Sequence, residues 1–285
     1  MKDKFLINVV PGDTFLHKLS GTTKVRLFVT LLIFITMSFD LRLILPVFIL
    51  TLLGVISAKP NWKQVKLIMS VVLFFNLLNI FLFYVANPVV GEYWCGQLTI
   101  IGRLSDYFVF PVETFWYLFV RLIKMLTNFM VSLWFITTIT PSEFAAGLYS
   151  LGVPYKVCTV VSLGFRYIPD IARDYENIKI SMQLRGVEMD AKRTKISERL
   201  KQMVLILVPL IITSFDRVQT IANGMDLRGY GRHKKRTYYC EHEPTEADKI
   251  FQFFTLILFV FSIGYIISVN VWPPQTHMWC PIVWR

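Results

Sequence analysis

The sequence predicts an all-α integral membrane protein, and three observations support this prediction. Of its 285 residues, 54% are hydrophobic and only 17% are charged, and the mean hydropathy is +0.52. A water-soluble domain carries about 25% charged residues, so this composition would leave too much apolar surface in water. Several stretches also approach the length of about 20 residues that a helix needs to cross the hydrocarbon. Together these features exclude disordered, collagen-like and ordinary cytosolic proteins.

About five membrane-spanning helices are expected, at about 25–39, 43–58, 65–86, 112–138 and 251–272. The first two are marginally short and are separated by Asp40-Leu41-Arg42, which predicts a helical hairpin with a tight polar turn. The chain then divides into an N-terminal membrane part, a polar segment, and a last helix with its tail. Their expected limits are 1–139, 140–249 and 250–285.

The basic residues predict the orientation of these spans. Successive connections, from the N-terminus to the tail, carry 5, 1, 3, 1, 17 and 1 lysines and arginines. Because cytoplasmic loops are enriched in these residues, the alternation predicts a multi-pass protein of the cell membrane with a cytoplasmic N-terminus. The same distribution, with attraction to anionic lipid, accounts for the net charge of +11, so no nucleic-acid partner is expected.

Charged residues and cysteines inside or beside the spans leave alternatives open. Arg121 and Lys124 lie in the long 112–138 span, and we expect both side chains to extend to the membrane surface. The alternative is a functional charge within the membrane. Cys95 and Cys280 both fall outside the cell in this topology, so they are either free or joined as a disulfide. No metal ligands and no catalytic residues stand at a recognisable spacing.

The polar segment is expected to hold one short helix and two long amphipathic helices, at about 141–151, 154–185 and 196–228. Thr140, Pro141 and Glu143 form a capping box with proline at the first helical position. Gly152 is expected to end the short helix, and Pro154 can open the next one.

Apolar residues recur every three or four positions along both long helices, which predicts a continuous apolar face. The residues on these faces include Val161, Gly164, Ile168, Ile171, Met203, Leu207 and Leu210. The stretch 203–212 is apolar all round, so it is expected to be buried against protein or to lie in the membrane interface. A sixth membrane span is the alternative for this stretch.

Both long helices end in the same triplet, Leu184-Arg185-Gly186 and Leu227-Arg228-Gly229. Either triplet alone is an ordinary helix end, because glycine terminates helices and arginine complements the helix dipole. Two copies on similar helices indicate more. An arginine at a rigid helix tip can bind a carboxylate of a partner, and two such tips suit a partner with two similar surfaces.

The chain resembles the transmembrane T component of energy-coupling factor (ECF) vitamin and metal transporters, from about Leu16 to Gly231. The similarity is strongest in three proline-containing motifs and the two Arg-Gly triplets. The proline-containing motifs are Thr140-Pro141-Ser142-Glu143, Leu151-Gly152-Val153-Pro154 and Phe165-Arg166-Tyr167-Ile168-Pro169. The N-terminal segment 19–24 is looser than the family's Asp-Pro-Arg-Thr-Lys and matches mainly at Thr23-Lys24. The family motif is Ala-Arg-Gly, whereas this chain has Leu184 and Leu227 in place of the alanines.

The resemblance implies a non-catalytic coupling subunit. Arg185 and Arg228 would each dock in one of two ABC-type ATPase subunits, which bind the ATP and Mg²⁺. The apolar faces of the coupling helices would contact a substrate-binding S component that carries a vitamin or metal ion, and the chain itself would bind no cofactor. Consistent with this, the sequence contains no GxxxxGK[ST] motif for binding ATP.

Two other classes of function are weighed against this one. A polytopic membrane transferase with a basic phosphate site is suggested by Lys192, Arg193, Lys195, Arg199 and Lys201, although no acidic metal-binding set accompanies them. A self-contained secondary transporter would show paired inverted repeats, which the sequence lacks.

Overall fold

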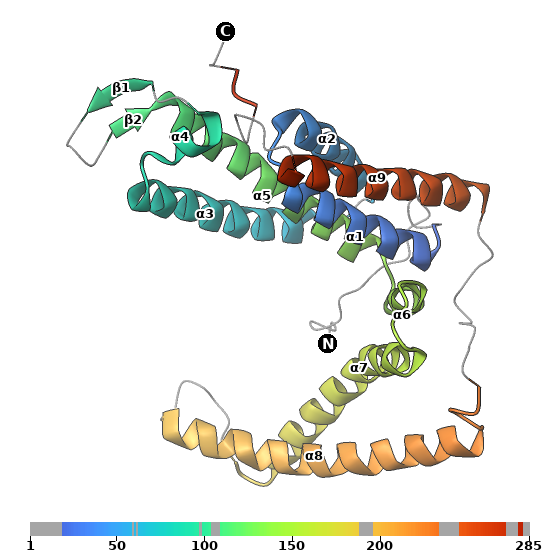
Figure 1. Cartoon of the computed structure of the whole chain (residues 1–285). Helices are drawn as coiled ribbons and strands as arrows, with labels where there is room; N and C mark the ends of the chain where they lie inside the picture. Colours follow the sequence, from blue (N-terminus) through green and yellow to red (C-terminus); the bar gives the residue numbers. More distant parts are fainter. Residues whose placement is uncertain are drawn as a thin grey trace. The chain divides into compact units, whose positions relative to one another are not determined.

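The computed structural model describes residues 19–58, 60, 62–96, 99–103, 109–187, 196–233, 245–271 and 279–281 (Figure 1). The described part is helical apart from one short hairpin. Its elements are α1 (Gly21–Met37), α2 (Leu41–Ser57), α3 (Trp62–Ala86), α4 (Val90–Cys95), β1 (Ile100–Arg103), β2 (Val109–Pro111), α5 (Val112–Thr138), α6 (Pro141–Ser150), α7 (Tyr155–Leu184), α8 (Ile196–Leu227) and α9 (Glu246–Val271).

The chain forms two compact units. We call residues 9–147 and 242–285 the bundle unit, and residues 1–8 and 148–241 the hairpin unit. In the bundle unit, α5 contacts α1, α2, α3 and α4, and α9 contacts α1. The central position of α5 explains why so many of its side chains are buried, among them Val120, Val131 and Trp134.

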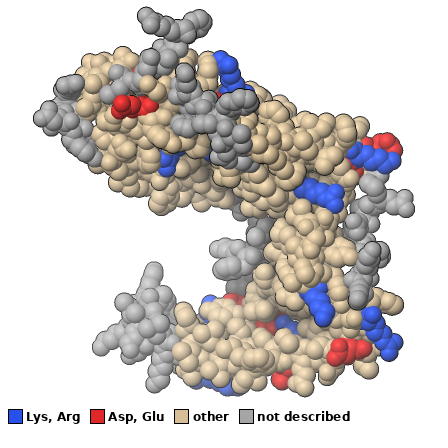
Figure 2. All heavy atoms as spheres, viewed as in Figure 1, with Lys and Arg blue, Asp and Glu red and all other residues tan. Residues whose placement is uncertain are grey.

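The apolar core of the bundle unit lies between α1, α2 and α5. Ile35 and Val131 are completely buried there, and the Phe28 and Phe135 rings stack with centroids 4.0 Å apart. Much of the outer surface is apolar as well, and Figure 2 shows few charged side chains on the visible face of this unit. A buried core surrounded by exposed apolar residues is the distribution expected of a helix bundle in lipid.

Four helices in the described residues are long and apolar enough to cross a membrane: α3, α5, α8 and α9. Helices α1 and α2 have 17 residues each, about 26 Å at 1.5 Å per residue, and are too short to be counted with these four. Three of the five expected spans, α3, α5 and α9, are therefore long and apolar enough to cross a membrane. Helix α8 is also long and apolar enough over Gln202–Leu227, so the structure leaves the alternative of a further span open.

Local signals explain where several helices begin. Ser20 caps α1, its Oγ accepting a hydrogen bond from the Thr23 N–H at 3.4 Å. The predicted capping box of α6 is confirmed: the Glu143 N–H donates to Thr140 Oγ1, and the Thr140 N–H donates to Glu143 Oε2 at 3.0 Å.

The connection between α3 and α5 holds structure that the sequence analysis did not predict. Helix α4 packs against the start of α5, and strands β1 and β2 pair antiparallel with Ile100 opposite Pro111. Gly91 allows the close approach of α4, because a Cβ there would meet the backbone of Thr114. The β-hairpin of β1 and β2 is a small addition to an all-α membrane protein.

Candidate functional site

The two helix ends predicted from the Leu-Arg-Gly triplets have the same structure. At the end of α7, the Gly186 N–H donates to Gln183 O at 3.0 Å and the Val187 N–H donates to Met182 O at 3.1 Å. At the end of α8, the Gly229 and Tyr230 N–H groups donate to Asp226 O and Met225 O, both at 2.9 Å. These are the two bonds of a Schellman motif.

The glycines in these motifs adopt the left-handed conformation that the motif requires. The φ angles of Gly186 and Gly229 are +86° and +71°, where other residues are strained. The arginine before each glycine is exposed, and the leucines before them, Leu184 and Leu227, are 84% and 90% exposed. Each helix therefore presents an unburied leucine and arginine at its tip.

Helix α6 shows that this motif does not require an arginine. It ends in the same pair of bonds, from the Gly152 N–H to Tyr149 O and from the Val153 N–H to Leu148 O, and the φ of Gly152 is +93°. The residue that precedes the glycine is Leu151. Capping alone therefore does not explain why Arg185 and Arg228 occupy the matching positions of the two long helices.

Helices α7 and α8 run antiparallel and cross within the hairpin unit (Figure 1). The Tyr155 and Tyr230 rings meet edge to face with centroids 5.9 Å apart, and the Arg217 guanidinium pairs with the Asp174 carboxylate. The end of α8 thus lies beside the start of α7. Because α7 has 30 residues, the two arginine-bearing tips lie at opposite ends of the helix pair, on the order of 45 Å apart.

The apolar faces of α7 and α8 are largely uncovered by the rest of the described chain. Ile168, Ile171, Met203 and Leu207 are between 40% and 56% exposed. Gly164 is also exposed, and Val161 and Leu210 are half-buried. The structure thus places the seven predicted face residues on one pair of contacting helices and leaves a broad apolar surface on them.

The expectation that Lys124 extends to the membrane surface is wrong. Its side chain is 9% exposed, its Nζ donates to Thr36 O at 2.7 Å, and the same atom lies 3.3 Å from the centroid of the Phe39 ring. The lysine therefore binds a free carbonyl in the last turn of α1, where the helix dipole favours a cation.

Arg121 also has partners within the bundle unit. Its guanidinium lies 3.9 Å from the centroid of the Phe83 ring and donates to Asn79 Oδ1 and Tyr117 Oη, both at 3.4 Å. These contacts join α3 to α5. Both cations in the span thus serve the packing of helices, which sequence reasoning missed because the partners are far away in the chain.

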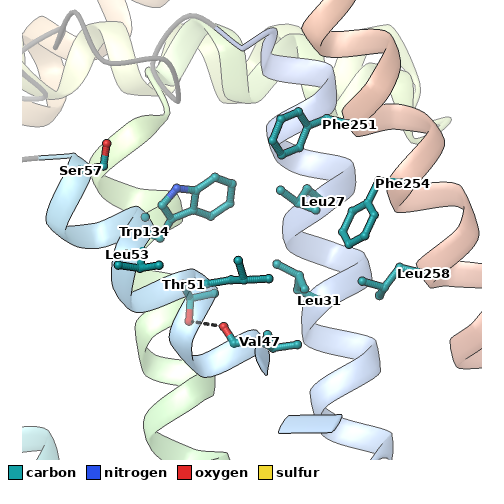
Figure 3. A pocket seen from close by; sticks show the side chains of 12 residues that line it. Leu27, Leu31, Val47, Thr51, Leu53, Ser57, Trp134, Phe251, Phe254 and Leu258 are labelled. Atoms are coloured by element: carbon teal, nitrogen blue, oxygen red, sulfur yellow. Dashed lines mark hydrogen bonds between the residues drawn. The ribbon is translucent and has the colours of Figure 1, made fainter. Parts of the chain in front are cut away.

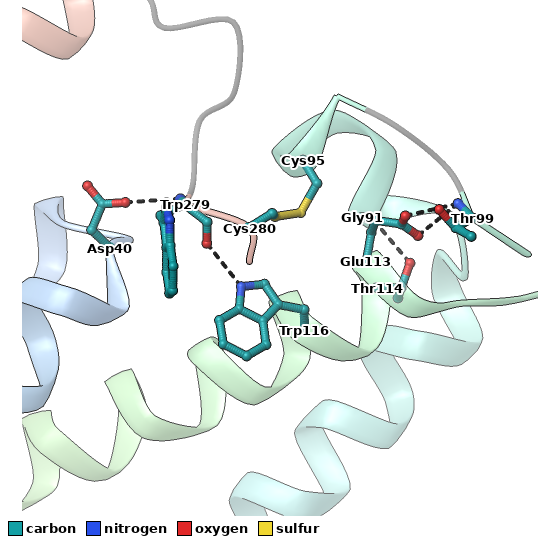
Figure 4. Close-up of a disulfide and its surroundings, with 9 residues drawn as sticks. All are labelled: Asp40, Gly91, Cys95, Thr99, Glu113, Thr114, Trp116, Trp279 and Cys280. Atoms are coloured by element: carbon teal, nitrogen blue, oxygen red, sulfur yellow. Dashed lines mark hydrogen bonds between the residues drawn. A yellow bond between two sulfur atoms is a disulfide. The ribbon is translucent and has the colours of Figure 1, made fainter. Parts of the chain in front are cut away.

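The disulfide left open by the sequence is formed, between Cys95, the last residue of α4, and Cys280 in the tail (Figure 4). Trp279, beside it, donates its N–H to Asp40 Oδ1 at 3.1 Å and accepts a bond from the Trp116 indole at 3.0 Å. The described tail residues are therefore fastened to α2, α4 and α5 at one end of the bundle unit.

An apolar groove of about 370 Å³ lies between α1, α2, α5 and α9 in the bundle unit (Figure 3). Leu27, Leu31 and Trp134 form part of its wall. Among the described residues that line it, the polar side chains are those of Thr51 and Ser57, and the Thr51 hydroxyl donates to Val47 O. This lining suits an acyl chain or an apolar helix, and the described residues in it include no acidic or basic side chain.

Among the described residues, no three His, Cys, Asp or Glu side chains are grouped closely enough to hold a metal ion. The basic cluster behind the transferase alternative, at 192–201, falls outside the described side chains. It therefore stays a prediction that the structure does not test.

Comparisons with known proteins agree on one family. The family model described as CbiQ, cobalt transport protein, matches residues 12–239. The energy-coupling factor transporter transmembrane protein EcfT of Clostridium kluyveri is 28% identical over 277 residues, which cover 92% of this chain and 97% of that relative. The EcfT proteins of Thermosediminibacter oceani and Bacillus subtilis are 25% and 27% identical, covering 95% and 84% of this chain and 100% and 89% of the relatives.

Proposed function

This chain belongs to the CbiQ family, as the transmembrane component of an energy-coupling factor transporter, and we propose that it couples two ABC-type ATPases to a substrate-binding S component. In this proposal the chain is not an enzyme and binds no cofactor. The partner ATPases bind ATP and Mg²⁺, and the S component binds the vitamin or metal ion that is imported.

One observation carries the proposal: α7 and α8 end in identical motifs with an exposed arginine, at opposite ends of one helix pair. A rigid guanidinium can make two parallel hydrogen bonds to a carboxylate. Two such tips, far apart, fit two similar subunits better than one small ligand. The motif at Gly152, which lacks the arginine, supports a role for Arg185 and Arg228 beyond capping.

The exposed apolar face of the hairpin unit supports contact with a second, hydrophobic partner. Large exposed apolar patches mark interfaces with protein or membrane. We propose that this face contacts the S component, through Val161, Gly164, Ile168 and Ile171 on α7 and Met203, Leu207 and Leu210 on α8. Lipid would cover the parts of the face that the S component leaves open.

We further propose that the protein lies in the cell membrane with its N-terminus in the cytoplasm. The charge count across the connections favours this orientation. The disulfide between Cys95 and Cys280 supports it independently, because disulfides persist in oxidising compartments outside the cytoplasm.

The test begins with gentle detergent purification of the tagged chain from its native cells and mass spectrometry of the proteins that accompany it. Two ATPase subunits and a small hydrophobic membrane protein are expected. The variant with both Arg185→Ala and Arg228→Ala should insert into the membrane normally but lose the ATPases by at least about tenfold, since each truncation removes a charge-assisted bidentate contact.

A matched control is Arg173→Ala, which removes an arginine that is 76% exposed on the side of α7 rather than at its tip. This control should retain the ATPases. Normal recovery of the ATPases with the double variant, or a wild-type chain that purifies alone under conditions that preserve other transporters, would contradict the proposal.

A further inference from the structure

A buried lysine joins three helices of the bundle unit. Lys24 on α1 is 1% exposed, and its Nζ donates to Thr138 O at 3.0 Å and to Glu143 Oε2 at 3.1 Å. Thr138 is the last residue of α5 and Glu143 lies in the first turn of α6. A buried charge is tolerated only with such partners, so these contacts constrain all three helices.

The same carboxylate also organises the start of α6. Glu143 Oε2 accepts the Thr140 N–H at 3.0 Å in addition to the Lys24 ammonium. One oxygen therefore closes the capping box of α6 and anchors this helix to α1. The direction in which α6 leaves α5 depends on this shared contact.

Two glycines bring the backbones of α1 and α6 together beside this ion pair. A Cβ on Gly147 would lie 2.8 Å from Gly21 O and would also collide with the Val25 side chain. A Cβ on Gly21 would collide with the backbone of Glu143. Phe144 adds an edge-to-face contact with Phe135 of α5 at 6.0 Å. The first two turns of α6 are thus held by polar, backbone and aromatic contacts.

This close packing ends where the bundle unit ends. Ala145 and Ala146 are buried, and the division between the two units falls immediately after Gly147. Gly152 with its positive φ and Pro154 follow before α7 begins. Residues 148–154 therefore connect a fixed part of α6 to α7.

We infer that Lys24 is a positioning residue that makes residues 141–147 of α6 one rigid body with the bundle unit. When α7 and α8 move, bending of the chain is then confined to residues 148–154. The force of the movement reaches the bundle unit through the contacts of α6 with α1 and α5. This inference rests on the proposed function for the source of the movement, the ATPases, while the rigidity of the joint belongs to the chain itself.

Hydrogen exchange measured by mass spectrometry tests the inference on the whole complex in lipid nanodiscs, with and without Mg-ATP. In the wild type, amides of 143–147 should stay protected in both states, and the changes linked to Mg-ATP should appear at 148–154. In Lys24→Met, exchange of 143–147 should accelerate at least tenfold and the changes linked to Mg-ATP should spread into it. Lys66→Met, which removes an exposed lysine of α3, should behave as the wild type.

A second variant separates positioning from general stability. Lys24→Met combined with Glu143→Gln leaves no unpaired charge at the joint. The melting temperature should therefore recover relative to Lys24→Met alone, while protection of the 143–147 amides from hydrogen exchange should stay low. Wild-type protection in Lys24→Met, or recovery of that protection in the double variant, would overturn the inference. The purified chain alone, without ATPases or Mg-ATP, should show the same difference in exchange of 143–147 between the wild type and Lys24→Met. A failure of the proposed function is therefore distinguishable from a failure of this inference.

Discussion

The two units bury their side chains very differently. In the bundle unit, Ile35, Val131 and the polar residues Lys24 and Glu113 are all at or near zero exposure. In the described part of the hairpin unit, only Cys158 and Ile206 are buried hydrophobic residues. The bundle unit therefore contains its own core, whereas α7 and α8 leave apolar faces that the other described residues do not cover. The proposed coupling role would account for this difference, because a coupling element makes its main contacts with other molecules.

The largest effect expected from this comparison is the cost of cutting back a core side chain. Ile35→Ala should lower the free energy of unfolding by about 2–4 kcal/mol, because the buried side chain leaves a cavity. Ile168→Ala, at 56% exposure on α7, should change it by no more than about 0.5 kcal/mol. Thermal unfolding of the purified chain measures both. Equal losses in the two variants would show that the face of α7 is covered within the chain.

The disulfide should have an effect of similar size to Ile35→Ala, and within the bundle unit alone. It closes a loop of 185 residues in sequence separation, so replacing Cys95 and Cys280 by serine should cost about 2–4 kcal/mol. A reductant should lower the melting temperature of the wild type and leave that of the double variant unchanged. Cys158→Ala serves as the control, since this buried thiol is free and its variant should still respond to reductant. A wild type that is insensitive to reductant would contradict the prediction.

The smallest effect concerns the link between α7 and α8. Asp174 and Arg217 are 27% and 31% exposed, so a double-mutant cycle with alanine should give a coupling of about 0.5–1 kcal/mol. The pair of Asp170 and Arg173, which lies within α7 and is more exposed, should give about zero. The rate of cleavage in the hairpin unit by chymotrypsin, which does not cut at the substituted arginines, reports both couplings. Equal values would mean that the two helices are held together by other contacts.

Sequence patterns predicted the local features of the candidate site well. The glycines that end α6, α7 and α8 and the capping box of α6 are confirmed, because each depends on residues within about five positions of one another. The roles of Arg185 and Arg228 stay predictions, because they concern contacts with other molecules. The apolar stretch in α8 is long enough to be a span, and its surroundings cannot be inferred from hydropathy alone.

Apart from α4 and the β1–β2 hairpin, which are local, the features that were missed or wrong depend on distant residues. Lys124 was expected at the membrane surface, but it binds Thr36 O, 88 positions away. The partners of Lys24 lie 114 and 119 positions away, although Thr23-Lys24 and Glu143 had both been singled out as motifs. A long apolar span accepts a lysine either at its end or against another helix, and composition does not distinguish the two.

The sequence by itself determined the membrane class, the order of the helices and the points where α6, α7 and α8 end. These follow from hydropathy and from hydrogen bonds that close within one helical turn. Only the tertiary structure decided that Lys24 joins α1 to α6, that Cys95 pairs with Cys280, and that no other described residues cover the faces of α7 and α8. The physical reason is that these contacts depend on which helices pack together, and a repeat of three or four residues specifies a face without specifying its partner.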